Sequence, residues 1–252
     1  MRLDGKICWI TGAGSGIGEA AALALAGEGA TVVLTGRRAA ALEAVAARVR
    51  DAGGTAQVQP ADVSVAEAVQ AVAAGIERRF GRLDVLVSNA GGNISARAWG
   101  ALTPAGVDEV IGANLASAFY CVTAALPMMR AQRDGVMIHT ASFAGRFVGL
   151  LSGPAYTAAK HGVVAMSHSI NQAECANGIR STAVCPGEVA TPILDRRPVP
   201  VPAEERARML QAADCADLIR YIACLPPHVC LNEVLITPTW NRGYIAAQHE
   251  RG

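Results

Sequence analysis

Residues 6–18 read KICWITGAGSGIG and join a short apolar run to a glycine-rich turn, which leads into the alanine-rich stretch EAAALALAGEG. A strand, a tight turn and a helix in this order begin a βαβ unit. Gly12 has no Cβ and permits the turn, Gly16 lets the backbone approach a pyrophosphate, and Gly18 permits close contact between helix and sheet. Free N–H groups at the start of the helix favour an anion. The stretch therefore predicts a dinucleotide-binding loop.

Short apolar runs alternate with alanine-rich helical stretches along the rest of the chain. Their near-continuous apolar character is typical of strands that are covered on both faces. Alternation of strand and helix predicts right-handed βαβ units and an α/β fold, a single-domain Rossmann-like doubly wound sheet of about seven parallel strands with helices on both faces. The predicted strands are 6–11, 31–35, 55–59, 83–89, 135–140, 179–185 and 233–237, and the predicted helices are 17–29, 38–52, 64–79, 103–133 and 154–176.

Two of these helices have recognisable start signals. Ser64, with Glu67 three residues later, is typical of a capping box. Thr103 followed by Pro104 places a cap residue before a proline at the first helical position.

Composition limits the classes of partner. The chain has 252 residues, 52% of them hydrophobic, and a formal net charge of +1 with charges of both signs interspersed. This balance predicts small-molecule ligands and neither nucleic acid nor a membrane surface as partner. The N-terminal residues reach glycines before any apolar run long enough for a signal peptide, and no later run is expected to span a membrane, so we expect a cytoplasmic protein.

Seven cysteines form an odd number without CxxC spacing, and several lie inside apolar runs such as STAVCP. This pattern predicts reduced core thiols, with neither a metal site nor a disulfide framework.

One segment interrupts the regular alternation. Residues 186–212 contain prolines at 198, 200 and 202 and then a short stretch with helical character near 203–211. Long irregular segments in a compact domain are commonly lids or binding loops. The chain is thus interpreted as one NAD(P)-binding Rossmann-like domain over 1–252, with a substrate loop around 186–212.

Polar residues follow two of the predicted strands. Asp62 comes after the third strand, and Asn89, Ala90 and Gly91 end the fourth. Taken singly, a helix cap and a turn are the better interpretations. Ligands of open α/β sheets bind at the carboxyl ends of the strands, so the shared edge favours a binding role.

Tyr156 and Lys160 are four residues apart in YTAAK and so lie on one face of a helix. A fixed ammonium beside a phenol favours the phenolate and lowers the phenol pKa. Ser142 follows the fifth strand, and Asn114 lies within a predicted helix among small apolar residues. Each of these residues also has a purely structural interpretation. Tyr156 and Lys160 can be a solvated pair on a helix surface, and Ser142 and Asn114 can be a helix cap or a hydrogen-bonded core residue.

Together these motifs resemble the short-chain dehydrogenase/reductase family over nearly the full length. The matching stretches are TGAGSGIG (11–18), Asp62-Val63, NAG (89–91), Asn114, Ser142, YTAAK (156–160) and PGEVAT (186–191).

The resemblance implies a role for each matching residue. Tyr156 would be the proton donor or acceptor, Ser142 would orient the substrate oxygen, and Asn114 would hold a water of a proton relay. Lys160 would tune the pKa of Tyr156 and bind a ribose. The implied cofactor-binding residues are Gly12, Ser15, Gly16, Ile17, Gly18, Asp62, Val63, Asn89, Ala90, Gly91, Tyr156, Lys160, Pro186, Gly187, Val189 and Thr191.

The sequence departs from the family at several positions. Ser88 and Cys185 stand where asparagines are frequent, and neither position is catalytic. Glu188 and Arg146 place charge near the expected pocket, where solvated surface charges are the simpler interpretation.

The second predicted strand ends in TGRR, residues 35–38. Gly36 occupies the place of the carboxylate that would bind the ribose of NAD. Arg37 and Arg38 can pair with a 2′-phosphate, so NADP is the preferred cofactor and NAD the alternative. Arg38 is equally consistent with a solvated charge that begins the next helix.

The predicted reaction is hydride transfer between a nicotinamide and a carbonyl/alcohol substrate. Alternatives are a nucleotide-dependent epimerase or dehydratase on the same fold, or a non-catalytic cofactor-binding regulatory protein. The expected pocket walls at 92–94, Phe147, Leu150, Leu151, Ile193 and Leu194 favour a hydrophobic or aromatic carbonyl. Family resemblance implies a homotetramer or homodimer, to which the tail after residue 237 would contribute unless it is disordered.

Overall fold

The computed structural model of the protein describes residues 1–197 and 199–249 and contains one seven-stranded sheet in the order β3-β2-β1-β4-β5-β6-β7. All neighbouring strands pair in parallel, which confirms the predicted doubly wound sheet. The strands are β1 (Ile7–Thr11), β2 (Thr31–Thr35), β3 (Thr55–Val58), β4 (Val85–Ser88), β5 (Gly135–Thr140), β6 (Ile179–Pro186) and β7 (Glu233–Ile236).

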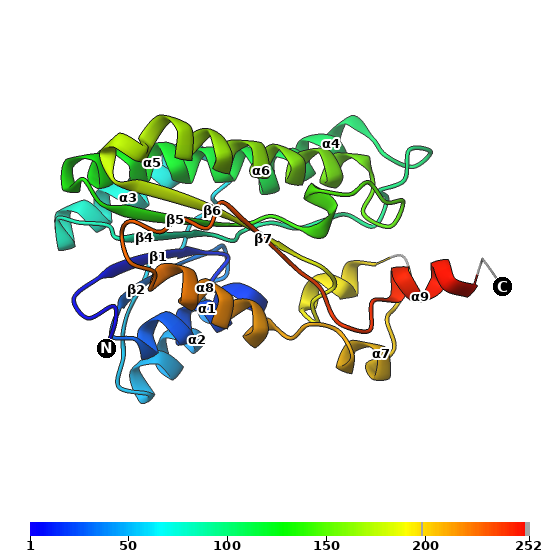
Figure 1. Cartoon of the computed structure of the whole chain (residues 1–252), viewed down its shortest axis with the longest axis horizontal. Coiled ribbons are helices and arrows are strands. Elements are labelled where there is room, and N and C mark those ends of the chain that lie inside the picture. Colours follow the sequence, from blue (N-terminus) through cyan, green and yellow to red (C-terminus); the bar gives the residue numbers. More distant parts are fainter. Residues whose placement is uncertain (198, 250–252) are drawn as a thin grey trace.

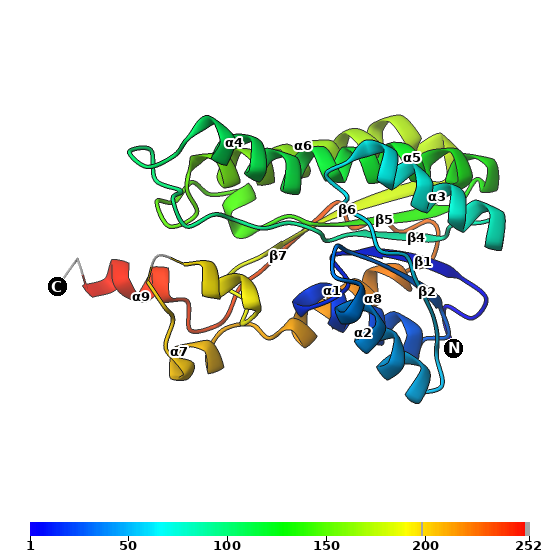
Figure 2. The ribbon, with the colours of Figure 1, turned by 180° about the vertical axis from the view of Figure 1, so that it is seen from behind.

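Helices cover both faces of the sheet (Figures 1 and 2). One layer contains α3 (Ala66–Phe80), α4 (Pro104–Ile111), α5 (Ser117–Gln132) and α6 (Pro154–Glu174). The other contains α1 (Gly16–Gly27), α2 (Ala39–Asp51) and α8 (Ala212–Ala223). At the end of the sheet near the start of α6 lie α7 (Ala203–Ala207) and α9 (Arg242–His249).

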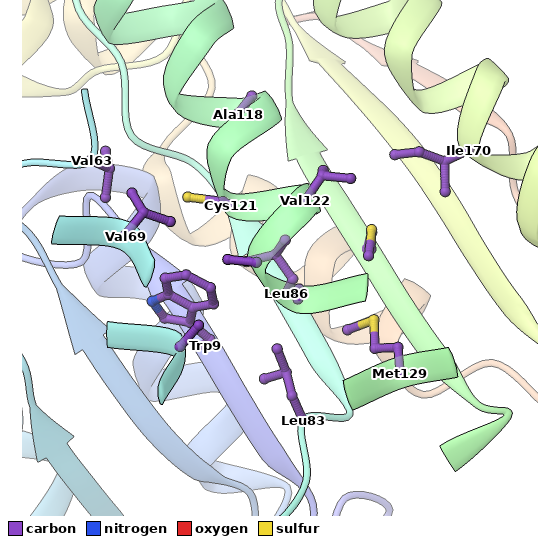
Figure 3. Close-up of a cluster of buried hydrophobic side chains, with 14 of the residues drawn as sticks. Trp9, Val63, Val69, Leu83, Leu86, Ala118, Cys121, Val122, Met129 and Ile170 are labelled. Carbon is purple, nitrogen blue, oxygen red and sulfur yellow. The ribbon is translucent and has the colours of Figure 1, made fainter. Parts of the chain in front are cut away.

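Side chains alternate between two cores along the central strands. Trp9 points into the core beneath α3, α5 and α6, where Leu86, Val122 and Met129 also lie (Figure 3). Its neighbour Ile10 points into the core beneath α1, α2 and α8. Both faces of these strands are apolar because helices cover the sheet on both sides, which accounts for the continuous apolar runs in the sequence.

Several helix boundaries differ from the predictions. Thr103 caps α4 as expected, because its Oγ1 accepts a hydrogen bond from Gly106 N at 3.1 Å. The predicted capping box at Ser64 is wrong: Ser64 donates from N and Oγ to the Asp62 carboxylate, and α3 begins at Ala66 with Val65 at its N-cap. Two helices, α8 and α9, had no counterpart among the predicted elements.

The predicted helix 103–133 contains a π-helical turn over Gly112–Ala116 between α4 and α5. Pro104–Gln132 is the one helical stretch within the described residues that is long and apolar enough to cross a membrane by length and composition. One such helix is weak evidence for a membrane span, so the expectation that no run spans a membrane is not overturned. Core helices meet the same criteria, and α5 buries Cys121, Val122 and Met129 against the sheet.

The irregular segment and the cysteines match the predictions in part. A 3-10 turn spans Pro192–Arg196 and a short helix follows at α7, while Pro198 lies outside the described residues.

All seven cysteines are free thiols, but only Cys8, Cys121, Cys185 and Cys215 are buried. Cys175 and Cys230 are exposed because each lies beyond the end of a packed element, so for them the core assignment was wrong.

A buried carboxylate joins the starts of β1 and β4. Asp84 accepts hydrogen bonds from Ile7 N at 2.9 Å, from Lys6 Nζ at 2.9 Å and from two nitrogens of Arg82. Burial would raise the pKa of Asp84, but these donors outweigh it and hold the pKa below its ordinary value.

Replacing Asp84 with Asn should therefore destabilise the protein by about 1 to 3 kcal/mol at pH 7, because the charge-assisted bonds are lost. The native carboxylate stabilises the fold above the ordinary carboxyl pKa, and this contribution is lost as the pH falls through its lowered native pKa. The difference between variant and wild type, measured by urea unfolding, should be constant above about pH 5 and shrink below pH 4. Asp51→Asn, on the exposed end of α2, is the control and should change stability by less than about 0.5 kcal/mol. A pH-independent difference would contradict this account.

Candidate active site

The carboxyl ends of β1 and β4 are held together by Thr11. Its Oγ1 accepts hydrogen bonds from the backbone N of Asn89 and of Ala90, both at 3.0 Å. The Asn89 side chain donates back to Thr11 O at 3.2 Å and to Gly12 O at 3.5 Å. Asn89 and Ala90 thus lie directly against the glycine-rich loop, as predicted. Thr11 had no assigned role, although it is the first residue of the TG pair in the motif.

The glycine-rich loop has the tight packing that the sequence predicted. Gly12 has a positive φ of 65°, which other residues rarely adopt. A Cβ on Gly18 would lie 2.4 Å from Gly12 O and 2.6 Å from Asn89 Nδ2, so only glycine fits between loop and helix. Thr191, in the segment after β6, approaches the loop, since a Cβ on Gly16 would lie 3.1 Å from its Cγ2.

The start of α1 is suited to an anion. Ser15 is its N-cap and has extended backbone, and within the described residues its side chain makes no capping hydrogen bond. The first N–H groups of the helix are therefore not satisfied by a side-chain cap, and they point toward the glycine loop. A close-fitting glycine cradle and an uncapped helix start fit the pyrophosphate of a nicotinamide dinucleotide.

The predicted segment 186–191 passes along the same edge. Pro186 ends β6, and Gly187 N donates to Ile236 O of β7 at 2.7 Å. Val189 is buried with Leu210 and Cys215, and the partly buried Ile17 packs on this cluster. The side chains of Val189 and Ile17 therefore support the loop from beneath.

The predicted adenosine end lies beyond β2. Gly36 O accepts a hydrogen bond from Ala61 N at 3.0 Å, which places Arg37 beside Asp62. Arg37 and Arg38 are exposed, and Arg38 is the N-cap of α2. Hydrogen bonds from Ser64, with a smaller contribution from Arg37, hold the pKa of Asp62 below its ordinary value.

Val63 differs from its neighbours in this region. Its side chain is buried in the core beside Val69 (Figure 3). Its side chain therefore packs beneath α3, and the expectation that Asp62 and Val63 border the adenine stays a prediction.

Ser142, Tyr156 and Lys160 converge from β5 and α6. The Ser142 side chain lies close enough to Tyr156 to act on the pKa of the phenol, and Ser142 Oγ accepts a hydrogen bond from Ala144 N at 3.1 Å. Lys160 is buried and donates from Nζ to Thr140 O at 2.8 Å. The same Nζ lies 5.5 Å from the centroid of the Tyr156 ring. The sequence-predicted triad is thus assembled in one place, with Tyr156 half-buried.

Asn114 and Gly91 complete this arrangement. A Cβ on Gly91 would lie 2.6 Å from Asn114 Oδ1 and 3.5 Å from Lys160 Nζ, so both side chains meet at this glycine. Asn114 is held in the π-helical turn by hydrogen bonds to Val110 O at 2.8 Å and to Gly92 O at 2.7 Å. Such turns inside α-helices are frequent at functional sites.

The pKa values show that burial is the strongest influence here. Burial raises the pKa of Tyr156, although the Ser142 hydrogen bond and the charge of Arg97 oppose the rise. Burial also lowers the pKa of Lys160 to about 8. The expectation that Lys160 brings the pKa of Tyr156 below its ordinary value is therefore wrong for this structure, because desolvation of the phenolate outweighs the nearby charges.

Two charged residues at the site had no firm role in the sequence interpretation. Arg97, in the loop after β4, lies close enough to Tyr156 to influence the pKa of the phenol, and no sequence motif marks this arginine.

Glu188 is not a solvated charge. Its carboxylate accepts hydrogen bonds from Arg197 Nη1 at 2.7 Å and from Arg242 Nε and Nη2 at 2.8 and 2.6 Å. Arg242 begins α9 and also pairs with Glu205 of α7, so the tail is bonded to the loop of its own chain.

Two cavities share Leu151 in their linings, and the described lining residues of neither include Ser142, Tyr156 or Lys160. One of about 530 Å³ is lined by Ser95, Ala96, Arg97, Ala98, Ala101, Leu150 and Leu151. Another of about 230 Å³ is lined by Leu151, Arg197, Val199, Pro200, Val201 and Arg242. Leu150 and Leu151 line cavities, whereas Leu194 is buried with Val201 and Met209, and the assignment of the substrate walls stays a prediction.

A family model described as short chain dehydrogenase matches residues 6–199. The chain belongs to the short-chain dehydrogenase family. Its members are oxidoreductases that use nicotinamide cofactors, and the enzyme class follows from membership.

Known relatives agree with this assignment. A "3beta-hydroxysteroid dehydrogenase" of Mediterraneibacter gnavus is 37% identical over 84% of this chain and 75% of the relative. The crystal structure of a metagenomic short-chain oxidoreductase in complex with NADP is 33% identical, with a TM-score of 0.83, over 95% of this chain and 100% of that one. A 7 alpha-hydroxysteroid dehydrogenase complexed with NADH and 7-oxo glycochenodeoxycholic acid is 25% identical, with a TM-score of 0.87, over 96% of each chain.

The packing around Gly18 can be tested with a single methyl group. Gly18→Ala should weaken NADP(H) binding by at least about tenfold and destabilise the protein by about 1 to 3 kcal/mol, because the Cβ displaces the Gly12 carbonyl. Fluorescence titration of NADPH measures the first effect and thermal unfolding the second.

Gly27→Ala, at the other end of α1, is the matched control because a Cβ there meets no atom within 4 Å. This control should bind NADPH like the wild type and be as stable or slightly more stable. Unchanged NADPH affinity in Gly18→Ala would show that the loop does not form the cofactor cradle.

Proposed function

We propose that the protein transfers a hydride between a nicotinamide cofactor and a carbonyl/secondary-alcohol pair, with Tyr156 as the acid/base. The convergence of Ser142, Tyr156 and Lys160 at the carboxyl edge of the sheet is the observation that carries the proposal. Lys160 lies over the Tyr156 ring and donates to Thr140 O, and Ser142 lies close enough to Tyr156 to influence its pKa.

Tyr156 supplies the proton in the reductive direction. Its raised pKa keeps the phenol protonated at neutral pH, which suits a proton donor. The Ser142 hydroxyl, close enough to Tyr156 to act on its pKa, orients the phenol and stabilises negative charge that develops there. Lys160 places a buried ammonium against the ring face and so stabilises the phenolate that forms. Asn114, which meets Lys160 at Gly91, continues the polar path away from the substrate.

The cofactor would be held by the glycine loop, by Asn89 to Gly91 and by the 186–191 segment. A bound nicotinamide supplies the hydride acceptor or donor, which no side chain can provide. We assign NADP as the preferred cofactor, with NAD as the alternative. The support is Gly36 in place of a carboxylate and the exposed guanidinium of Arg37 beyond it.

The substrate is proposed to be an apolar ketone or alcohol of hydroxysteroid or similar alicyclic type. Side chains of Trp99, Val148, Leu150, Leu151 and Val199 are exposed, and several line the cavities. Exposed apolar side chains gathered around a pocket favour a hydrophobic ligand. The relatives named for steroid substrates support the same class.

Replacing Tyr156 with Phe removes the proposed acid/base and keeps the ring. We expect kcat for carbonyl reduction to fall by about 100- to 10,000-fold, with NADPH affinity retained within about threefold. Steady-state kinetics and fluorescence titration measure the two effects. Tyr221→Phe, on the exposed face of α8, is the control and should have wild-type kinetics. Full activity of Tyr156→Phe would exclude Tyr156 as the acid/base.

Cofactor choice can be tested at the end of β2. Arg37→Ala should lower the ratio of kcat/KM for NADPH to that for NADH by about 10- to 100-fold, because a charge-assisted bond to the 2′-phosphate is lost. Arg38→Ala should have a smaller effect, since Arg38 is the N-cap of α2. An unchanged ratio in Arg37→Ala would contradict the assigned role.

A further inference from the structure

We propose that Glu188 ties helix α9 to the cofactor site, so that docking of α9 and binding of the nicotinamide dinucleotide stabilise each other. Glu188 is thus a positioning residue, and Arg242 of α9 is its partner. The inference rests on the proposed cofactor site and adds to it a helix that no cofactor motif includes. The family model matches residues 6–199, and α9 lies beyond them.

Helix α9 buries little of its own surface. From Arg242 to Gln248 none of its residues is buried, and most are exposed. Figure 1 shows α9 next to α7 and outside the two helical layers that cover the sheet. A helix that buries so little apolar surface gains little from the hydrophobic effect. We therefore expect the position of α9 to depend on polar contacts.

Arg242 makes such contacts at the first residue of α9. Its Nε donates to Glu188 Oε2 at 2.8 Å, and its Nη2 donates to Glu188 Oε1 at 2.6 Å. Two parallel bonds from one guanidinium to one carboxylate are a strong geometry for an ion pair. The third nitrogen, Nη1, donates to Glu205 of α7. The side chains of Glu188 and Arg242 are 21% and 27% exposed, so water screens their attraction less than that of a surface pair.

The Glu188 carboxylate depends on both of its arginine partners. Burial raises the pKa of this carboxyl, but the hydrogen bonds from Arg242 and Arg197 outweigh burial and hold the pKa below its ordinary value. Arg197, at the end of the 3-10 turn, donates its Nη1 to Glu188 Oε1 at 2.7 Å. Undocking of α9 would leave the partly buried carboxylate with one arginine in place of two. The segment that carries Glu188 would then be held less firmly, because its charge is better solvated by water than by a single partner.

The segment that carries Glu188 also contacts the glycine-rich loop. A Cβ on Gly16 would lie 3.1 Å from Cγ2 of Thr191, three residues after Glu188. Backbone hydrogen bonds hold the segment between these two points: Leu210 N donates to Glu188 O at 3.1 Å, and Ala190 N donates to Leu210 O at 2.8 Å. The segment is therefore fixed through its backbone by Leu210 and through the Glu188 side chain by α9. A displacement at Glu188 reaches the glycine loop within three residues.

This connection couples two binding events. A dinucleotide held by the glycine loop and by residues 186–191 binds most tightly when loop and segment keep the arrangement that docked α9 supports. By linkage, the bound dinucleotide favours the docked state of α9 by the same factor. Because Leu210 holds the segment independently of α9, we expect a moderate factor of about 5- to 50-fold.

Hydrogen–deuterium exchange and NADPH titration measure the two sides of the coupling. In the wild type, saturating NADP+ should slow exchange of the amides at 245–248 by about 5- to 50-fold. In Arg242→Gln these amides should exchange fast with or without NADP+, and the NADPH dissociation constant should rise by the same factor within about threefold. Glu188→Gln should show both effects. Arg242→Lys should be intermediate, since an ammonium keeps the charge but not the fork. NADH and NAD+ replace NADPH and NADP+ if NADH binds more tightly.

Arg78→Gln, on the exposed face of α3, is the control for the loss of one arginine and should keep wild-type exchange and affinity. Thermal unfolding of each variant identifies a folding defect, and Arg242→Lys provides the comparison if Glu188→Gln does not fold. Wild-type NADPH affinity in Arg242→Gln would overturn the inference. Exchange at 245–248 that does not respond to the dinucleotide in the wild type would overturn it as well.

Neither measurement depends on turnover, so the two proposals can fail separately. Absence of reduction across a wide panel of ketones, with α9 and the dinucleotide coupled by equal factors, would overturn the proposed function and leave the coupling standing. Reduction of ketones by an enzyme whose α9 exchanges alike with and without the dinucleotide would support the proposed function and overturn the role of Glu188.

Discussion

The hydrogen bonds between Thr11 and the backbone of Asn89 and Ala90 join two strands that are adjacent in space but separated in sequence by three helices and two strands. The strands that follow β1 in the chain, β2 and β3, lie on one side of it in the sheet. The strands β5, β6 and β7 follow β4 and lie on the opposite side. The crevice at the carboxyl ends lies where these directions diverge. Because Asn89 also bonds to the carbonyl of Gly12, the glycine loop and the loop after β4 are positioned by a single contact. The packing of Gly18 into that contact explains why one added methyl group should disturb the whole site.

Burial determines the chemistry available at this crevice. A phenol and an ammonium that both lose water tend toward their neutral forms, and the structure shows this for Tyr156 and for Lys160. The compensating contacts are specific and short in range: the Ser142 hydroxyl for Tyr156, and the Thr140 carbonyl for Lys160. Desolvation therefore favours the protonated phenol as a proton donor at neutral pH, whereas it opposes the charge of Lys160, which the hydrogen bond to Thr140 O helps to stabilise.

Ion pairs connect parts of the chain that the sheet does not organise. Glu188 lies in the segment after β6, Arg197 at the end of the 3-10 turn that follows, and Arg242 at the start of α9, and all three meet through the Glu188 carboxylate. These side chains are mostly buried, so their attraction is screened less by water than that of a surface pair. The cavity of about 230 Å³ lies over this group, which gives the C-terminal segment a direct part in shaping the pocket.

Local sequence determined the strand–glycine loop–helix unit, the seven parallel strands and the Tyr156/Lys160 pair, because hydrophobic periodicity, glycine spacing and a four-residue helical interval act over short distances. Helix α8 has a clear apolar face and a capping box between Gln211 and Asp214, so its signal was present in the sequence, but glutamine is an unusual cap residue and the helix was missed. Ser64 did not cap its helix because the carboxylate of Asp62 offered both of its donors a nearer acceptor. Only the tertiary structure placed Arg97 beside Tyr156, buried Glu188 among arginines and raised the pKa of the tyrosine. Each of those outcomes depends on desolvation and on charges brought together from distant segments, which no local pattern of residues records.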